Sequence, residues 1–245
     1  MKKLFIILLI FYSSVLYAES PTGKDILEKI DKNLVARSRV STSTMIIKGR
    51  RGTRTVKAKT WAEGIERGFT EYLAPAREKG TKMLKIKDEL WTWTPSTDRI
   101  IKIAGHMLRQ SMLGSDISYE DFMEDPILSN TYDSKISGEE DIDGRPCYIL
   151  DLRAKEDNVA YSNRILWVDK ERYVALREDL FAKSGNLLKT LRIKEVFKID
   201  NRWYPKRMIF KDVLKKGSGT ELIIDSIEFN LKIPSRIFSK ASLRR

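Results

Sequence analysis

Alternation of apolar and polar residues runs through most of this chain and is interrupted by short turns rich in glycine, asparagine and aspartate. Each such segment reads as a strand, and because the turns are short, neighbours in the sequence must pair antiparallel. The segments lie at 42–48, 53–62, 68–73, 83–86, 90–93, 99–104, 132–137, 145–153, 162–168, 173–181, 187–199, 203–213 and 220–231. The pattern predicts an α+β fold in which about eleven strands form a curved antiparallel sheet, an open half-barrel.

One long helix is expected before the first strand, at 25–37. Ile26, Leu27, Ile30 and Leu34 fall on one stripe of that helix, and charged residues occupy the rest of its surface. A helix with a single apolar face requires a surface to cover. We therefore expect it to lie against the concave face of the sheet and to close part of the half-barrel.

The segment 77–125 combines two strand-like runs with a change of period. Trp91 and Trp93 are two residues apart on an expected strand, so both project to one face of the sheet. Helical spacing begins after Gly105, and it predicts two short helices at 106–113 and 118–124, here called the cover. A capping-box pair, Ser118 with Asp121, supports the start of the second helix.

Methionine-rich helices between glycines are typical of a mobile cover over an apolar binding surface, because methionine adapts its shape to varied partners. The same apolar stripes also fit ordinary core packing, and that alternative stays open. If they do form a binding surface, a cavity between the sheet and the cover holds acyl chains. Its candidate residues are Met83, Trp91, Trp93, Met107, Leu108, Met112, Leu113, Phe122 and Met123.

The N-terminus has the pattern of a secretory signal peptide. Lys2 and Lys3 precede an apolar run at 4–16 that is too short to span a bilayer, and Ala18 precedes polar sequence. We expect cleavage after Ala18, which leaves 19–245 as one exported domain. No later segment resembles a membrane span, so a soluble periplasmic protein without a transmembrane segment is predicted.

The net charge of +12 at pH 7 favours anionic partners. Its densest cluster surrounds the turn at 49–52 and comprises Lys48, Arg50, Arg51, Arg54, Lys57 and Lys59. The sequence has no nucleic-acid motif and no basic helix, so nucleic acid is not expected as a partner. A solvated hairpin and a docking site for lipid head groups or an acidic partner remain alternatives, with Arg50, Arg51 and Arg54 as the docking candidates.

Residues for catalysis are scarce in this sequence. There is no HExxH, CxxC, GxSxG or glycine-rich phosphate loop. Cys147 is the single cysteine and reads as a buried structural thiol, because His106 is the only histidine available as its base. Carboxylates at 139–143 lack the spacing of a calcium loop. We expect no enzyme activity, no cofactor and no metal site.

Six short motifs, taken in order, resemble the outer membrane lipoprotein-sorting branch of the periplasmic LolA/LolB-like carrier superfamily. They are REKGTKM at 77–83, LWTWTP at 90–95, GSDISYEDF at 114–122, GRPCY at 144–148, WYPKR at 203–207 and NLKIP at 230–234, followed by Phe238. The resemblance implies an eleven-stranded open barrel closed by helices. It also implies an apolar cavity that shields the acyl chains of a lipoprotein or lipid on the way to the outer membrane.

Proteins of this branch are often associated with inner-membrane lipid transporters of the resistance-nodulation-division (RND) or ABC type. Two hypotheses therefore stand. The chain is either an acyl-chain carrier or a docking or regulatory module of such a transporter that binds no lipid. No functional residue of the well-studied carriers aligns with a single position here, so none is transferred.

Overall fold

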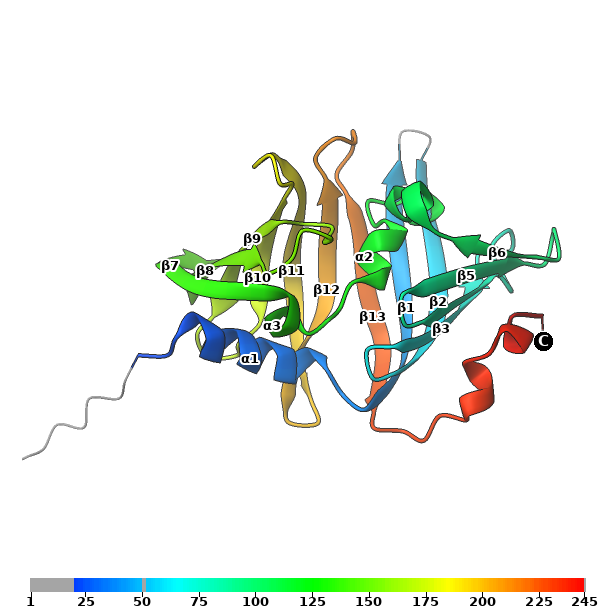
Figure 1. The fold of residues 1–245 in the computed structure, drawn as a ribbon, viewed down its shortest axis with the longest axis horizontal. Helices are drawn as coiled ribbons and strands as arrows, with labels where there is room; N and C mark the ends of the chain where they lie inside the picture. Colours follow the sequence, from blue (N-terminus) through cyan, green and yellow to red (C-terminus); the bar gives the residue numbers. More distant parts are fainter. Residues whose placement is uncertain (1–19, 50–51, 245) are drawn as a thin grey trace, which may run out of the picture.

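The computed structural model describes residues 20–49 and 52–244. It confirms the predicted fold class, because the chain forms one open, curved antiparallel sheet with few helices (Figure 1). All thirteen segments expected as strands are strands. The expected total of about eleven was therefore too low. The signal peptide expected at 1–18 lies outside the described residues.

The strands are short at one side of the sheet and long in its middle. Their bounds are β1 Ser38–Gly49, β2 Gly52–Glu63, β3 Arg67–Ala74, β4 Lys82–Ile86, β5 Glu89–Thr94, β6 Arg99–Ile103, β7 Tyr132–Ile142, β8 Arg145–Ala154, β9 Asn163–Asp169, β10 Ala175–Phe181, β11 Leu187–Ile199, β12 Arg202–Asp212 and β13 Thr220–Phe229.

The order of the strands explains where the cover lies. Spatial order runs β6-β5-β4-β3-β2-β1-β13-β12-β11-β10-β9-β8-β7, so every neighbouring pair is consecutive in sequence except β1 and β13. The chain runs outward from β1 to β6, then crosses to the opposite edge at β7 and returns inward to β13. Strands β1–β6 are called one wing of the sheet, and strands β7–β13 the other wing. The crossing segment, residues 104–131, contains the cover and passes over the concave face between the two edges (Figure 1).

Helix α1, Gly23–Leu34, lies along the concave face of the β7–β10 wing (Figure 1). Thr22 caps its N-terminus in a capping box with Asp25. The helix starts two residues before the expected 25–37 and ends three residues earlier, because Val35 is already extended. The Asn33 side chain donates to the backbone carbonyl oxygens of Arg172 and Tyr173, which fixes this end of the helix to the sheet.

Apolar side chains are buried on both faces of the sheet. On the concave face, α1 packs over β7–β10 and the cover packs over β3–β6. On the opposite, convex face, the C-terminal segment 233–243 packs over β3–β5 with its two short 3-10 helices η3 Ser235–Ile237 and η4 Lys240–Arg244. Within the described residues, no helix is both long enough and apolar enough to cross a membrane.

Candidate functional site

An apolar cavity of about 370 Å³ lies between the concave face of the sheet, α1 and the cover. Its volume falls within the range of small-molecule sites. Apolar side chains from both wings and from both covering elements form its walls. They are Ile30, Leu34, Met45, Val56, Met112, Ile117, Phe122, Val174, Ala175, Leu191, Ile193, Met208, Phe210, Leu222 and Ile224.

Small side chains in the middle of the concave face create this space. On β1 and β2 the inward positions are Ser41, Ser43, Ala58 and Thr60, and Thr70 stands beside them on β3. None of these side chains extends far enough to fill the gap below α2. This floor was not predicted from the sequence, although the serine- and threonine-rich run at 41–44, within an expected strand, was a usable signal.

The cover is less regular than expected. In place of a helix at 106–113, the chain forms two 3-10 turns, η1 Gly105–Arg109 and η2 Met112–Gly114. Leu113 has a positive φ of 53°, and φ is also positive at Gly105 (55°) and Gly114 (71°). A continuous α-helix does not tolerate such angles. The second expected helix is present as α2, Tyr119–Met123, and the predicted capping box of Ser118 and Asp121 is formed.

Two of the nine candidate residues line the cavity, Met112 and Phe122. Five more lie next to it in the apolar cluster that joins the cover to β3–β6, around the buried Tyr72 and Leu90. These five are Met83, Met107, Leu108, Leu113 and Met123. Their positions hold the cover on the sheet and place Met112 and Phe122 over the floor.

Trp91 and Trp93 do not face the cavity, contrary to the expected placement. Both point to the convex face, where Trp91 is buried with Phe69 and Phe238, and the ammonium of Lys240 lies 4.2 Å from the centre of its ring. Trp93 packs at the edge of the same cluster. Alternation correctly put the two rings on one face. It could not indicate which face, because both faces of this sheet are covered.

The basic turn is described only in part. Arg50 and Arg51 lie outside the described residues. Arg54 is half-buried, and its guanidinium donates a hydrogen bond to the backbone carbonyl oxygen of Leu113 in the cover. Arg54 therefore holds the cover in place, a role that its basic neighbours in the sequence did not suggest.

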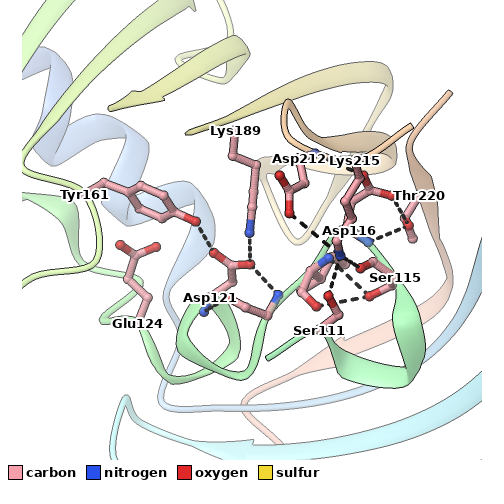
Figure 2. A network of polar contacts seen from close by, with 12 residues as sticks. Ser111, Ser115, Asp116, Asp121, Glu124, Tyr161, Lys189, Asp212, Lys215 and Thr220 are labelled. Carbon is pink, nitrogen blue, oxygen red and sulfur yellow. Dashed lines mark hydrogen bonds and ion pairs between the residues drawn. The ribbon is translucent and has the colours of Figure 1, made fainter. Parts of the chain in front are cut away.

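A buried polar network fixes α2 to the opposite wing (Figure 2). Asp121 accepts hydrogen bonds from the ammonium of Lys189 on β11 and from the hydroxyl of Tyr161, the latter at 2.5 Å. Burial alone would raise the pKa of the Asp121 carboxyl, but the charge and hydrogen bond of Lys189, with the Tyr161 and Ser118 hydrogen bonds, hold it below its ordinary value. Asp121 is thus ionised at neutral pH and joins the cover to the side of the sheet that contains β11.

A second polar network holds the turn before α2 (Figure 2). The Asp116 carboxylate accepts from the Thr220 hydroxyl at 2.8 Å and from the backbone N–H of Asp212 at 3.0 Å. The Lys215 ammonium donates to the Ser111 hydroxyl and to the backbone carbonyl oxygen of Ser115. The cover is therefore tied to the β12–β13 turn as well as to β11, and the sequence patterns had identified none of these partners.

Arg164 is a buried cation beside α2. It pairs with Glu124 at the end of α2, and with Glu178 on β10 at 3.7 Å. Burial lowers the pKa of Arg164 and raises that of Glu178, and each charge partly offsets the shift of the other. Of the two partners, Glu178 lines the cavity, and Arg164 lies behind it.

Cys147 is buried, as expected. Burial raises the pKa of its thiol to about 11, so the thiolate that a nucleophile requires is scarce at neutral pH. Across the described part of the chain, no three His, Cys, Asp or Glu side chains gather closely enough to hold a metal ion. The site is therefore an apolar cavity whose cover is held by polar side chains.

A family model that carries only the description of an uncharacterized protein matches residues 64–245 of this chain. No curated protein matches the sequence. Among solved structures, a DUF1329 family protein from Desulfovibrio piger has a TM-score of 0.82 at 26% identity, and the alignment covers 90% of this chain and 97% of that one.

Two further solved structures share the fold. A domain named for outer membrane lipoprotein sorting, from Vibrio parahaemolyticus, has a TM-score of 0.78 at 23% identity over 91% of this chain and 98% of that one. A LolA superfamily protein from Nitrosomonas europaea has a TM-score of 0.75 at 24% identity over 91% of this chain and all of that one, 100%. The fold that the sequence resemblance implied is thereby confirmed.

Proposed function

Since this chain belongs to the family matched over residues 64–245 and has the fold of the LolA superfamily, we propose that it is a non-catalytic periplasmic carrier of acyl chains. Its cargo is a lipid or a lipoprotein that travels toward the outer membrane. The observation that carries this proposal is the apolar cavity of about 370 Å³ under the cover. The signal-peptide pattern at 1–18 supports the location.

The free energy available from such a cavity suits a carrier. Burial of each methylene contributes about 0.8 kcal/mol, so eight sequestered carbons supply on the order of 6 kcal/mol before the cost of ordering the chain is subtracted. An affinity of that size keeps cargo out of water and still permits its release to a membrane. Met112 and Phe122 sit on short elements, so once the polar contacts that hold the cover are released, the cover can move without breaking a long helix.

A fluorescent fatty-acyl probe, competed by unlabelled phospholipid, tests the proposal. Met112→Asp and Phe122→Asp place a charge on the cavity wall, and we expect each to weaken binding at least about tenfold, a change of about 1.4 kcal/mol. Ile101→Asp is the matched control, because Ile101 is 46% exposed on β6. If the parent binds no probe, or if both cavity variants bind as well as the parent, the carrier proposal is wrong. An empty cavity would instead favour the transporter-docking module.

A partner at the inner membrane, of the RND or ABC type, remains part of the proposal, and the basic turn is its candidate contact. Arg50 and Arg51 are better targets than Arg54, which holds the cover. Exchange of Arg50 and Arg51 for glutamate should weaken binding to anionic vesicles or to the partner, and added salt should weaken binding by the parent. Unchanged association would identify a solvated turn.

A further inference from the structure

A second, polar chamber adjoins the apolar cavity. It has a volume of about 360 Å³. The residues that it shares with the first cavity are Leu34, Arg39, Thr60, Asp121, Phe122, Glu178 and Leu191. The chamber reaches the exposed Gly64 and Arg67 beside the β2–β3 turn, so it connects the apolar cavity with the surface. A ligand that fills both spaces needs an apolar end and a polar end.

Two half-buried cations project into this chamber from the concave face. Arg39 stands on β1 and donates to the Tyr204 hydroxyl at 3.2 Å. Lys85 stands on β4 and donates to the backbone carbonyl oxygen of Met123 at 2.9 Å. Within the described ranges, neither forms an ion pair with a carboxylate.

The electrostatics of Lys85 show that its charge is incompletely compensated. Burial lowers the pKa of its ammonium, and the nearby charge of Arg39 adds to that effect, while Asp125 and Asp88 oppose it. An anionic ligand in the chamber would restore the pKa and would gain from both cations at once. Hydrogen bonds between ionised groups are the strong ones, above all where water is excluded.

Three of the four carboxylates that line the chamber are paired with a cation, and the fourth, Asp125, keeps its charge and acts on Lys85. Glu124 and Glu178 pair with Arg164, and Asp121 is held by Lys189 and Tyr161. Asp125 accepts from the backbone N–H of Ile127 at 2.8 Å and from the Asn130 side chain at 3.1 Å. Arg67, at the mouth of the chamber, pairs with Glu63 at 2.9 Å. Arg39 and Lys85 are therefore the lining cations without a carboxylate partner among the described residues, and they remain for an anion that enters from the surface.

We propose that Arg39 and Lys85 form the head-group subsite for an acyl lipid that carries negative charge next to its chain, with the chain in the apolar cavity. This inference rests on the carrier function proposed above and narrows its substrate class. The shared chemistry is an anionic oxygen, from the carboxylate of a fatty acid or the phosphate of a glycerophospholipid. A neutral, fully acylated head would leave both cations without an added partner.

The proposal is tested by measuring how well three ligands displace a fluorescent acyl probe. All three have a sixteen-carbon chain, a common laboratory length, and they differ in the head group: palmitate, palmitoyl lysophosphatidate and neutral hexadecanol. We expect both anionic ligands to compete at about tenfold lower concentration than hexadecanol, equivalent to about 1.4 kcal/mol. The anionic ligand that competes at the lower concentration shows whether the subsite prefers a carboxylate or a phosphate. Inorganic phosphate alone should not displace the probe, because it has no chain.

Arg39→Gln and Lys85→Met should each reduce the preference for anions about threefold, because the two cations share a preference of about tenfold, and should leave hexadecanol binding unchanged. The charge-keeping Arg39→Lys and Lys85→Arg should retain most of the preference. Arg99→Gln and Lys57→Met are matched controls, because both residues are exposed and line neither cavity. Equal binding of anionic and neutral ligands by the parent, or an unchanged preference in both neutralised variants, overturns the subsite alone. Failure of every ligand, hexadecanol included, overturns the carrier function as well.

Discussion

Ala58 shows how one small side chain controls the cavity. It lies on the inward face of β2 between Val56 and Thr60, and its methyl group leaves the volume above it open. A larger residue would occupy space that a ligand needs, and it would fill a void without displacing packed atoms. Stability and binding should therefore respond differently to substitution at this position.

We predict that Ala58→Leu weakens acyl-probe binding about tenfold, while the free energy of unfolding changes by less than about 1 kcal/mol. Probe titration and urea unfolding measure the two effects. Thr55→Leu on the exposed, outward face of the same strand is the control and should leave binding unchanged. Normal binding by Ala58→Leu would mean that cargo does not reach the floor.

Lys189 sets the charge state of Asp121 and, through it, the pH range in which the cover is anchored. In the parent, the Asp121 pKa is below its ordinary value, so its contribution to stability is full above about pH 4 and is lost as pH falls further. Without Lys189, burial dominates and the Asp121 pKa rises above its ordinary value. The pH dependence then changes sign, because stability from a raised pKa is lost as pH increases.

Lys189→Met should therefore lower the free energy of unfolding by about 3 kcal/mol at pH 7, and this loss should shrink as the pH is reduced to about 5. Urea unfolding at both pH values measures the change. Lys183→Met is a suitable control, because Lys183 pairs with Asp157 at the exposed surface and should have little effect. An equal loss at both pH values would show that Asp121 stays ionised without Lys189.

At the scale of elements, the structure was predictable from the sequence where a local signal determines the geometry. Period-two alternation located the strands, and the Ser118–Asp121 pair located α2, because both depend on neighbouring residues alone. The stretch at 106–113 has helical spacing but lies between glycines with positive φ, and tertiary contacts decide its shape. Burial of Lys189, Asp116 and Arg164 also depends on partners far away in sequence.

Gly23 controls how closely α1 approaches the sheet. A Cβ atom at this position would lie 2.8 Å from the backbone carbonyl oxygen of Ser134 on β7. Backbone atoms of a strand cannot move aside cheaply. We predict that Gly23→Ala lowers the free energy of unfolding by about 1–3 kcal/mol, in the range of overpacked positions.

Gly138→Ala is the matched control for Gly23→Ala, because its Cβ would meet only the side chain of Ile149 at an ordinary 3.6 Å. Thermal unfolding compares the two variants. Equal melting temperatures would show that α1 shifts along the wing without cost. A loss confined to Gly23→Ala would show that contact with β7 fixes the helix and the cavity wall that Ile30 and Leu34 provide.

For the whole molecule, the two faces of the sheet have different tasks. The concave face keeps a cavity between α1 and the cover, whereas the convex face of β3–β5 is filled by Trp91, Phe69 and the C-terminal segment. The sequence predicted a curved sheet with an apolar interior, but it could not assign the tryptophans to a face. That assignment depends on residues 233–243, which close the convex face from the far end of the chain.

Loss of packing on the convex face should therefore cost stability without changing cargo binding. Phe238→Ala and Leu243→Ala each remove a buried apolar side chain next to Trp91, and we expect each to lower the free energy of unfolding by about 3 kcal/mol. Leu231→Ala, at a 39% exposed position, should cost much less. Urea unfolding and acyl-probe titration on the same samples separate stability from binding.

Because Phe238 and Leu243 line neither the cavity nor the polar chamber, folded samples of both variants should bind the probe as tightly as the parent. Weaker binding by folded Phe238→Ala would show instead that the convex face and the cavity are coupled through the sheet.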